Sequence, residues 1–217
     1  VHISPSHHFP TGTVTPASRR YELLGWAAKQ PGRYIIEDEY DSEFRLVGNP
    51  IPALQSIDAS DKVIYMNTFS KSLSSTIRIS YMVLPIPLMV RYNHVLSFYA
   101  CTVSNFDQYT LTRFIQEGYL EKHINRMRKF YRNSRDRILS CIRNHRLYPQ
   151  VTIKEENAGL HFLMEVDTSY TDKEMVDRAA AAGINISSLS QYCHGKEQED
   201  SHTLVINYSG IEEDIIE

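Results

Sequence analysis

The stretch YIIEDEYDSEFR at residues 34–45 does most to decide the fold. It opens with a short apolar run that lacks polar alternation, which is typical of a β-strand covered on both faces. Two similar runs follow, VIYMNTF at 63–69 and ISYMVL at 79–84, and helical patterns occupy about 86–98 and 105–117. Strands joined by crossovers in this order predict an α/β fold with a mostly parallel sheet.

A long helical pattern separates this region from the rest of the chain. Apolar residues recur at spacings of three and four from Leu120 over about 27 residues, which is long enough to connect two subdomains. The strand-like segment GLHFLMEV follows at 159–166, and a second helix is expected from Thr171. Thr171 and Glu174 have the spacing of a capping box, in which each side chain bonds the backbone of the other residue.

The remaining segments complete a small α+β domain. INIS at 184–187 and LVINY at 204–208 are strand-like. We place the boundary inside the long helix, so that one domain covers residues 1–125 and the other covers 126–217. Val1 opens directly into a strand-like segment and the chain stops at the start of an amphipathic helix, so we expect it to be a piece of a longer polypeptide.

The composition is that of a soluble globular protein, because 42% of the 217 residues are hydrophobic and 11% are aromatic. No apolar stretch reaches the roughly 18 to 20 residues of a membrane-spanning helix, and the first residues do not resemble a secretory signal. Cys101, Cys141 and Cys193 are unclustered, which argues against a disulfide framework or a thiolate metal site. We therefore expect a cytoplasmic protein without a metal.

Charge is spread unevenly along the chain, although the net charge is only −3. Residues 119–150 hold nine Lys or Arg and two acids, whereas residues 151–217 hold four and fourteen. The favoured interpretation of the basic block is a helix with a solvated basic face, and the alternative is a surface for phosphates.

The acidic stretch after the first apolar run is the first candidate site. Polar residues at the carboxyl end of a buried strand lie where α/β sheets bind ligands. Asp38 and Tyr40 are two residues apart, so in extended backbone their side chains point to the same face. The five acids within residues 37–43 also allow a Mg²⁺ site, the acidic strand of a phosphate-hydrolysing protein, or a solvated acidic turn. The phosphate-hydrolysing interpretation requires a GxxxxGK[ST] loop, and the chain contains none.

The second candidate site is NTFSKSLSSTIR at 67–78. Lys71 follows an apolar strand, where desolvation would lower the pKa of its amine and make it a nucleophile toward aldehydes. The hydroxyl groups of Thr68 and Ser70 flank it, and Arg78 follows seven residues later. A guanidinium and hydroxyl groups beside a reactive amine suit an aldehyde that carries a phosphate. The alternative is an exposed lysine without a role.

Taken together, the two sites match the polar parts of pyridoxal phosphate. A carboxylate is available for the pyridine nitrogen, a phenol for the ring oxygen, and an amine for the aldehyde. The arginine and the hydroxyl groups are available for the phosphate. The pair of sites is therefore more specific than either site alone.

Five segments resemble the aminotransferase-like domain of the MocR/GabR family of GntR-type bacterial transcription regulators. The resemblance covers nearly the whole chain, and the strings EDxYDSEF and TFSK are its most specific parts. It implies the fold-type I architecture of pyridoxal-phosphate-dependent transferases, with part of the large domain followed by the small domain. It also implies a winged-helix DNA-binding domain that precedes these residues and is absent from this chain. The segments are PSHHFPTGTVTPASRRYELLGWA (5–27), YIIEDEYDSEFR (34–45), PALQSID (52–58), VIYMNTFSKSL (63–73) and AGLHFLMEV (158–166).

The resemblance also implies a role for each candidate residue. Lys71 would form the internal aldimine, Asp38 would pair with the pyridine nitrogen, and Tyr40 would bond the ring oxygen. The phosphate would be bound by Arg78, Ser70 and Thr68.

Two positions depart from the aminotransferase pattern. Phe9 stands where aminotransferases commonly have the Asn of NPTG. Val205 stands where the resemblance expects the arginine that binds a substrate carboxylate. The second departure weakens the case for transamination, because turnover needs a positioned carboxylate.

The main hypothesis is therefore an effector-sensing domain of a transcription regulator. An amine or amino-acid effector would form an aldimine with pyridoxal phosphate, and the protein would be a homodimer. The first alternative is a catalytically active class I/II aminotransferase whose substrate is held by another arginine. The second is a dimerisation scaffold that binds no cofactor. The sequence leaves open whether the chain is an enzyme.

Overall fold

The computed structural model describes residues 1–49, 51–193 and 200–211. Within it the chain forms two compact units. We call them the N-terminal unit and the C-terminal unit. The N-terminal unit comprises residues 1–7, 14–43 and 49–128, and the C-terminal unit comprises residues 8–13, 44–48 and 129–217.

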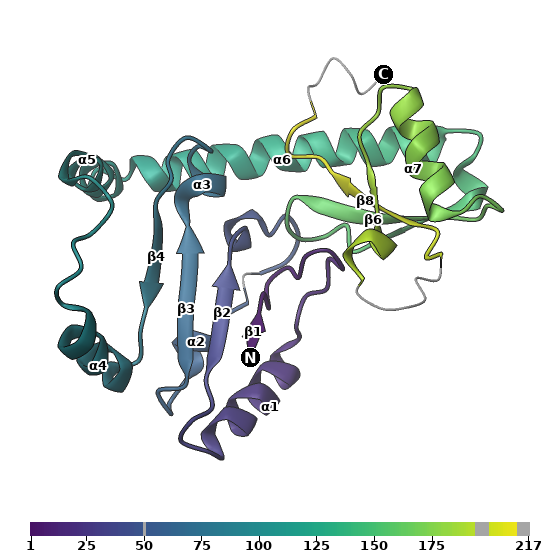
Figure 1. The fold of residues 1–217 in the computed structure, drawn as a ribbon. Coiled ribbons are helices and arrows are strands. Elements are labelled where there is room, and N and C mark those ends of the chain that lie inside the picture. The colour runs from purple at the N-terminus through teal and green to yellow at the C-terminus, as the bar shows by residue number, and fades with distance from the viewer. Residues whose placement is uncertain (50, 194–199, 212–217) are drawn as a thin grey trace. The chain divides into compact units, whose positions relative to one another are not determined.

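A four-stranded sheet forms the centre of the N-terminal unit, in the order β1-β2-β3-β4. Strands β1 (His2–Ile3), β2 (Ile35–Glu39) and β3 (Val63–Thr68) run parallel, whereas β4 (Ser80–Val83) is antiparallel to β3 (Figure 1). This arrangement confirms the predicted α/β fold with a mostly parallel sheet.

One face of this sheet carries the apolar core of the unit. Helix α1 (Ala17–Ala28) and the short helix α2 (Leu54–Ile57) pack there, and the core consists of Ala27, Ile35, Leu54 and Val63. Burial alternates along β2, so that the residues between the core positions are only partly buried. The expectation of strands covered on both faces is therefore not met within the described residues.

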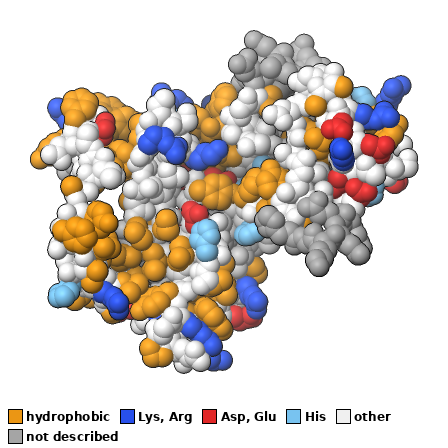
Figure 2. Space-filling model, viewed as in Figure 1, with side chains coloured by type: hydrophobic (Ala, Val, Ile, Leu, Met, Phe, Trp, Pro, Cys, Tyr) orange, Lys and Arg blue, Asp and Glu red, His pale blue; other side chains and the backbone are white. Residues whose placement is uncertain are grey.

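Helices α3 (Phe69–Ser72), α4 (Ile86–Leu96) and α5 (Asn105–Gln116) complete the unit. The positions of α4 and α5 agree with the two helical patterns in the sequence. Neither helix buries a residue. Figure 2 shows hydrophobic side chains gathered over both of them.

The C-terminal unit contains an antiparallel sheet in the order β5-β6-β8-β7. Its strands are β5 (Val151–Lys154), β6 (His161–Val166), β7 (Ser187–Ser188) and β8 (Thr203–Asn207). Strand β5 was not predicted from the sequence. Of the strand-like segment INIS at 184–187, only Ser187 belongs to a strand.

Two helices accompany this sheet. Helix α7 (Asp172–Ala181) begins with the predicted capping box, and both of its hydrogen bonds are present. The long helix α6 (Tyr119–Asn144) agrees with the predicted one and enters the C-terminal unit at Lys129. Short 3-10 turns lie at Ser42–Phe44, Tyr148–Gln150 and Leu189–Tyr192.

Some of the basic residues of α6 are used inside the chain. Arg135 is buried and donates from Nη1 to the carbonyl oxygen of Glu156 at 3.0 Å, and Arg143 forms an ion pair with the Glu156 carboxylate at 2.8 Å. The basic block is therefore only partly a solvated surface. No helix among the described residues is long and apolar enough to cross a membrane.

Candidate functional site

The candidate site begins at the carboxyl ends of β2 and β3, which are parallel neighbours. Asp38 lies opposite Met66 in the register of the two strands. Paired residues of adjacent strands project from the same face, and side chains two apart in one strand share a face. The side chains of Asp38 and Thr68 therefore project from the same face of the sheet, the one opposite to the α1 core.

Asp38 keeps part of its carboxylate accessible. Its Oδ2 lies 3.2 Å from Nε2 of His2, and its side chain is 34% exposed. One oxygen is thus oriented by an imidazole, while the group retains surface for a ligand. A carboxylate in this state can pair with a protonated ring nitrogen.

Tyr40 is held by the loop that follows β1. Its hydroxyl group donates to the carbonyl oxygen of His7 at 2.9 Å and lies 3.4 Å from Nδ1 of the same residue. Burial, together with the nearby charges of Asp41 and Asp38, raises the pKa of Tyr40 above its ordinary value. The phenol therefore keeps its proton and can act as a hydrogen-bond donor.

The residues after β3 form a second group of polar side chains. The Thr68 hydroxyl caps α3 by accepting from the backbone N–H of Ser70 at 3.2 Å. The Ser70 hydroxyl donates to the carbonyl oxygen of Ile77 at 3.0 Å and accepts from Nη1 of Arg78 at 3.3 Å. The structure therefore brings together the three residues that the sequence analysis assigned to a phosphate.

Lys71 belongs to α3 and directly follows Ser70 in the sequence. Its side chain is exposed within the described chain. The burial expected for an amine at the end of an apolar strand is therefore not found, because Lys71 lies in α3 after the strand has ended. An accessible amine is nevertheless what an incoming aldehyde requires.

All six predicted site residues lie in the N-terminal unit. Their chemistry fits pyridoxal phosphate, because a partly exposed carboxylate, a protonated phenol, an amine and a guanidinium with two hydroxyl groups occupy neighbouring strand ends. The sequence analysis predicted these residue types and their grouping. The hydrogen bonds of His2 to Asp38 and of His7 to Asp41 were not predicted. Each bond joins residues about 35 positions apart in the sequence.

Buried acidic side chains project from the face of β2 that carries the apolar core. These acids and Asp38 were treated as one group in the sequence analysis. Glu37 accepts hydrogen bonds from the backbone N–H groups of Leu54 at 2.7 Å and Gln55 at 2.9 Å. Glu39 accepts from the Ser6 hydroxyl at 2.7 Å. These acids are structural, so the interpretation of this stretch as a solvated acidic turn is wrong. The period of two along a strand was the signal that could have revealed this.

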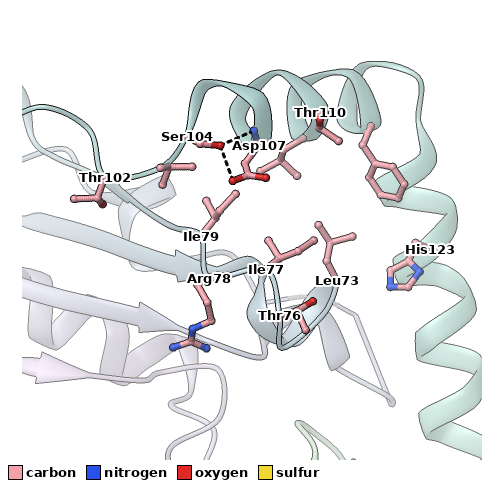
Figure 3. Close-up of a pocket in the computed structure, with 13 residues that line it drawn as sticks. Leu73, Thr76, Ile77, Arg78, Ile79, Thr102, Ser104, Asp107, Thr110 and His123 are labelled. Atoms are coloured by element: carbon pink, nitrogen blue, oxygen red, sulfur yellow. Dashed lines mark hydrogen bonds between the residues drawn. The ribbon is translucent and has the colours of Figure 1, made fainter.

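A cavity of about 580 Å³ borders the turn after α3. Figure 3 shows that Leu73, Ile77 and Ile79 line it and that the Arg78 guanidinium points away from Asp107. Among the described residues of the candidate site, only Arg78 borders this cavity. The candidate cofactor groups therefore do not gather around it.

The comparisons with known proteins agree with this geometry. The sequence model of the family "Aminotransferase class I and II" matches residues 2–206, and the chain belongs to this family. The crystal structure of kynurenine aminotransferase from Pyrococcus horikoshii in complex with PMP is similar over 100% of the chain and 52% of that protein. The TM-score of this match is 0.84, with 28% sequence identity. The predicted fold-type I architecture is thereby confirmed.

Two regulators are also similar to the chain. The HTH-type transcriptional regulator YdeL of Bacillus subtilis is 42% identical over 98% of the chain and 45% of that protein. The probable rhizopine catabolism regulatory protein MocR of Rhizobium meliloti is 33% identical over 98% of the chain and 42% of that protein. The chain thus spans less than half the length of these relatives. The predicted resemblance to MocR-type regulators is confirmed.

The two departures from the aminotransferase pattern lie in the C-terminal unit. Val205 is a buried residue of β8 and is paired with Leu163 and Ser187. Phe9 packs edge-on against His161, with ring centroids 5.3 Å apart, and against Tyr192 at 4.9 Å. Both side chains are apolar packing elements, so position 205 offers no charge to a substrate carboxylate.

Proposed function

We propose that the chain is the cofactor-binding and effector-sensing part of a MocR-type transcription regulator. The observation that carries the proposal is the hydrogen-bonded group of Thr68, Ser70 and Arg78 beside Lys71 in the sequence, with Asp38 on the same face of the adjacent strand as Thr68. The family and the regulators that resemble the chain support it. The resident cofactor would be pyridoxal phosphate, and it would supply an electrophilic aldehyde.

Each residue then has one task. The amine of Lys71 would bind the aldehyde, and Asp38 would hold a proton on the ring nitrogen. Tyr40 would donate a hydrogen bond to the ring oxygen. Arg78, with the hydroxyl groups of Thr68 and Ser70, would bind the phosphate, because a guanidinium and hydroxyl groups match its oxygens.

An amine or amino-acid effector would compete with Lys71 for the aldehyde. Such an exchange requires only a free amine, whereas transamination also requires that the substrate carboxylate is positioned. The buried Val205 in β8 favours sensing over turnover. The second candidate function, a class I/II aminotransferase, is favoured by the structural match to the Pyrococcus horikoshii enzyme.

We further propose that the protein is a cytoplasmic homodimer that contacts DNA through a separate N-terminal domain. Aromatic side chains on and near α4 and α5 support self-association, because Phe98, Tyr99, Phe106 and Tyr109 are each at least 67% exposed in the single chain. We assign residues 1–125 to the large domain of the fold and residues 126–217 to the small domain.

Covalent labelling tests the proposal. The full-length protein is incubated with pyridoxal phosphate, reduced with borohydride and digested, and the labelled peptide is identified by mass spectrometry. We expect the label on Lys71 and its loss in Lys71→Ala. Lys62→Ala is the matched control, because Lys62 is a partly buried lysine at the opposite end of β3, where its amine donates to the carbonyl oxygen of Pro31. A label that persists in Lys71→Ala would refute the proposal.

Turnover distinguishes the two candidate functions. The full-length protein is incubated with an amino acid and a keto acid, and the new amino acid is quantified. A sensor is expected to convert at most about one equivalent per site. Conversion of many equivalents would establish the aminotransferase.

A further inference from the structure

We propose that His7 and Asp41 are positioning residues that hold the hydroxyl group of Tyr40 where it can donate a hydrogen bond to the ring oxygen of the cofactor. This inference rests on the proposed function, because it concerns the same site. The two added residues, His7 and Asp41, are both buried. The supporting observations are three contacts among side chains and backbone within the N-terminal unit.

The first contact is a buried pair. Nδ1 of His7 lies 2.8 Å from Oδ2 of Asp41, and the two side chains are 1% and 3% exposed. A carboxylate accepts hydrogen bonds, so the ring carries its hydrogen on Nδ1 and donates it to Asp41. Because both side chains are buried, the bond to Asp41 helps to orient the imidazole.

The other two contacts connect His7 to Tyr40. The Tyr40 oxygen is 2.9 Å from the His7 carbonyl oxygen and 3.4 Å from Nδ1, and the two rings are 6.4 Å apart at 35°. The backbone and the ring of one residue thus locate the phenol oxygen from two sides. If the imidazole were removed, the backbone carbonyl alone would locate the phenol oxygen.

The phenol can serve a ligand without moving its oxygen. In the structure its hydrogen is directed to the His7 carbonyl. Rotation about the C–O bond redirects that hydrogen to another acceptor while the oxygen stays in place. A donor held in advance needs less reorganisation when the acceptor arrives, so its hydrogen bond to an anionic oxygen is stronger.

This role has a spectroscopic consequence. A hydrogen bond from Tyr40 favours the deprotonated ring oxygen of the bound cofactor, because an anionic acceptor binds a donor more strongly than a neutral one. Weakening that bond raises the pH at which the absorbance of the bound cofactor changes. A purely structural role of His7 would lower thermal stability but leave this pH unchanged.

The test is a pH titration of cofactor absorbance in full-length protein reconstituted with pyridoxal phosphate. Tyr40→Phe sets the reference shift. We expect His7→Leu to raise the midpoint by about one pH unit, a tenfold change in the proton dissociation constant. In His7→Asn the side-chain amide can replace Nδ1 as donor, so the midpoint should return most of the way to that of the wild type.

Two further variants complete the design. His8→Leu is the matched control, because the neighbouring His8 is exposed and its Nδ1 lies 3.0 Å from the hydroxyl group of Thr11. This substitution is expected to leave the midpoint unchanged. Asp41→Asn keeps an acceptor for His7 but removes the charge, so a smaller shift in the same direction is expected. It provides the measurement if His7→Leu does not fold.

The outcomes separate this inference from the proposed function. A His7→Leu or Asp41→Asn protein that binds the cofactor with the midpoint of the wild type would overturn the inference, even if Lys71 is labelled. Absence of label on Lys71 in the wild type would overturn the proposed function itself. A shift in His7→Leu that His7→Asn reverses would support both.

Discussion

Glu39 provides the sharpest stability prediction, because burial raises the pKa of its carboxyl group from 4.5 to about 8. The charge of Glu37 adds to this effect, and the hydrogen bond from Ser6 opposes it. The Glu39 side chain is therefore protonated in the folded chain at neutral pH, whereas in the unfolded chain it is ionised. The change to test is Glu39→Gln, which mimics the protonated group and can still accept from Ser6.

The sign follows from proton linkage. Between pH 4.5 and about 8 the folded state binds one proton more than the unfolded state at this site, so the free energy of unfolding falls as the pH rises. The slope is about 1.4 kcal/mol per pH unit, and the loss over the window is on the order of 5 kcal/mol. Above pH 8 the contribution becomes constant. Glu39→Gln is expected to remove this slope, and the variant should be more stable than the wild type at pH 8.

Urea unfolding between pH 4 and 9 measures the effect. Trp26 is the single tryptophan of the chain and belongs to the same compact unit as Glu39, so its fluorescence follows the unfolding of that unit. Glu22→Gln is the matched control, because the Glu22 side chain is 61% exposed and should leave the slope unchanged. Parallel stability curves for wild type and Glu39→Gln would refute the reasoning.

Two further predictions concern the C-terminal unit. Asp172→Asn should lower its free energy of unfolding by about 2 kcal/mol, since the buried carboxylate accepts from the N–H and hydroxyl groups of Ser201 and from the N–H of His202. Burial raises the pKa of Asp172, but hydrogen bonds from Ser190, Ser201 and His202 outweigh it and lower that pKa. The loss relative to wild type should therefore shrink when the pH falls below 3.8 in urea unfolding followed by circular dichroism. Thr171→Ala should cost about 1 kcal/mol in the same assay because it removes the capping box with Glu174, and an equal stability of variant and wild type would contradict the assigned cap.

Local patterns were sufficient for much of the fold. Runs of apolar residues predicted β2 and β3, and the spacing of three and four predicted α6 within a few residues of its ends. These elements are readable because their apolar periodicity is itself the cause of their burial. The strand β5 was not predicted, although the exposure of its four residues alternates. A run of four residues is too short for its period to stand out from the flanking chain.

Some features of the candidate site were also predicted from the sequence, and others were not. Lys71, Ser70 and Arg78 lie within eight residues of one another, so their residue types and closeness in sequence predicted one site for an aldehyde that carries a phosphate. The burial expected for Lys71 is not found, because burial depends on which segments cover a residue in the folded chain and not on its sequence neighbours. The pairing of His7 with Asp41 was not predicted, because it joins positions 34 residues apart.

By itself the sequence determined the residue types of the candidate site, the strands that carry them and the family to which the chain belongs. Only the tertiary structure decided that Glu37, Glu39 and Asp41 are buried while Asp38 keeps an accessible carboxylate. Alternation along a strand separates two sets of side chains, but it does not say which set a helix will cover. That choice is made by the packing of α1 and α2 on one face of the sheet, and such packing joins segments that are distant along the chain.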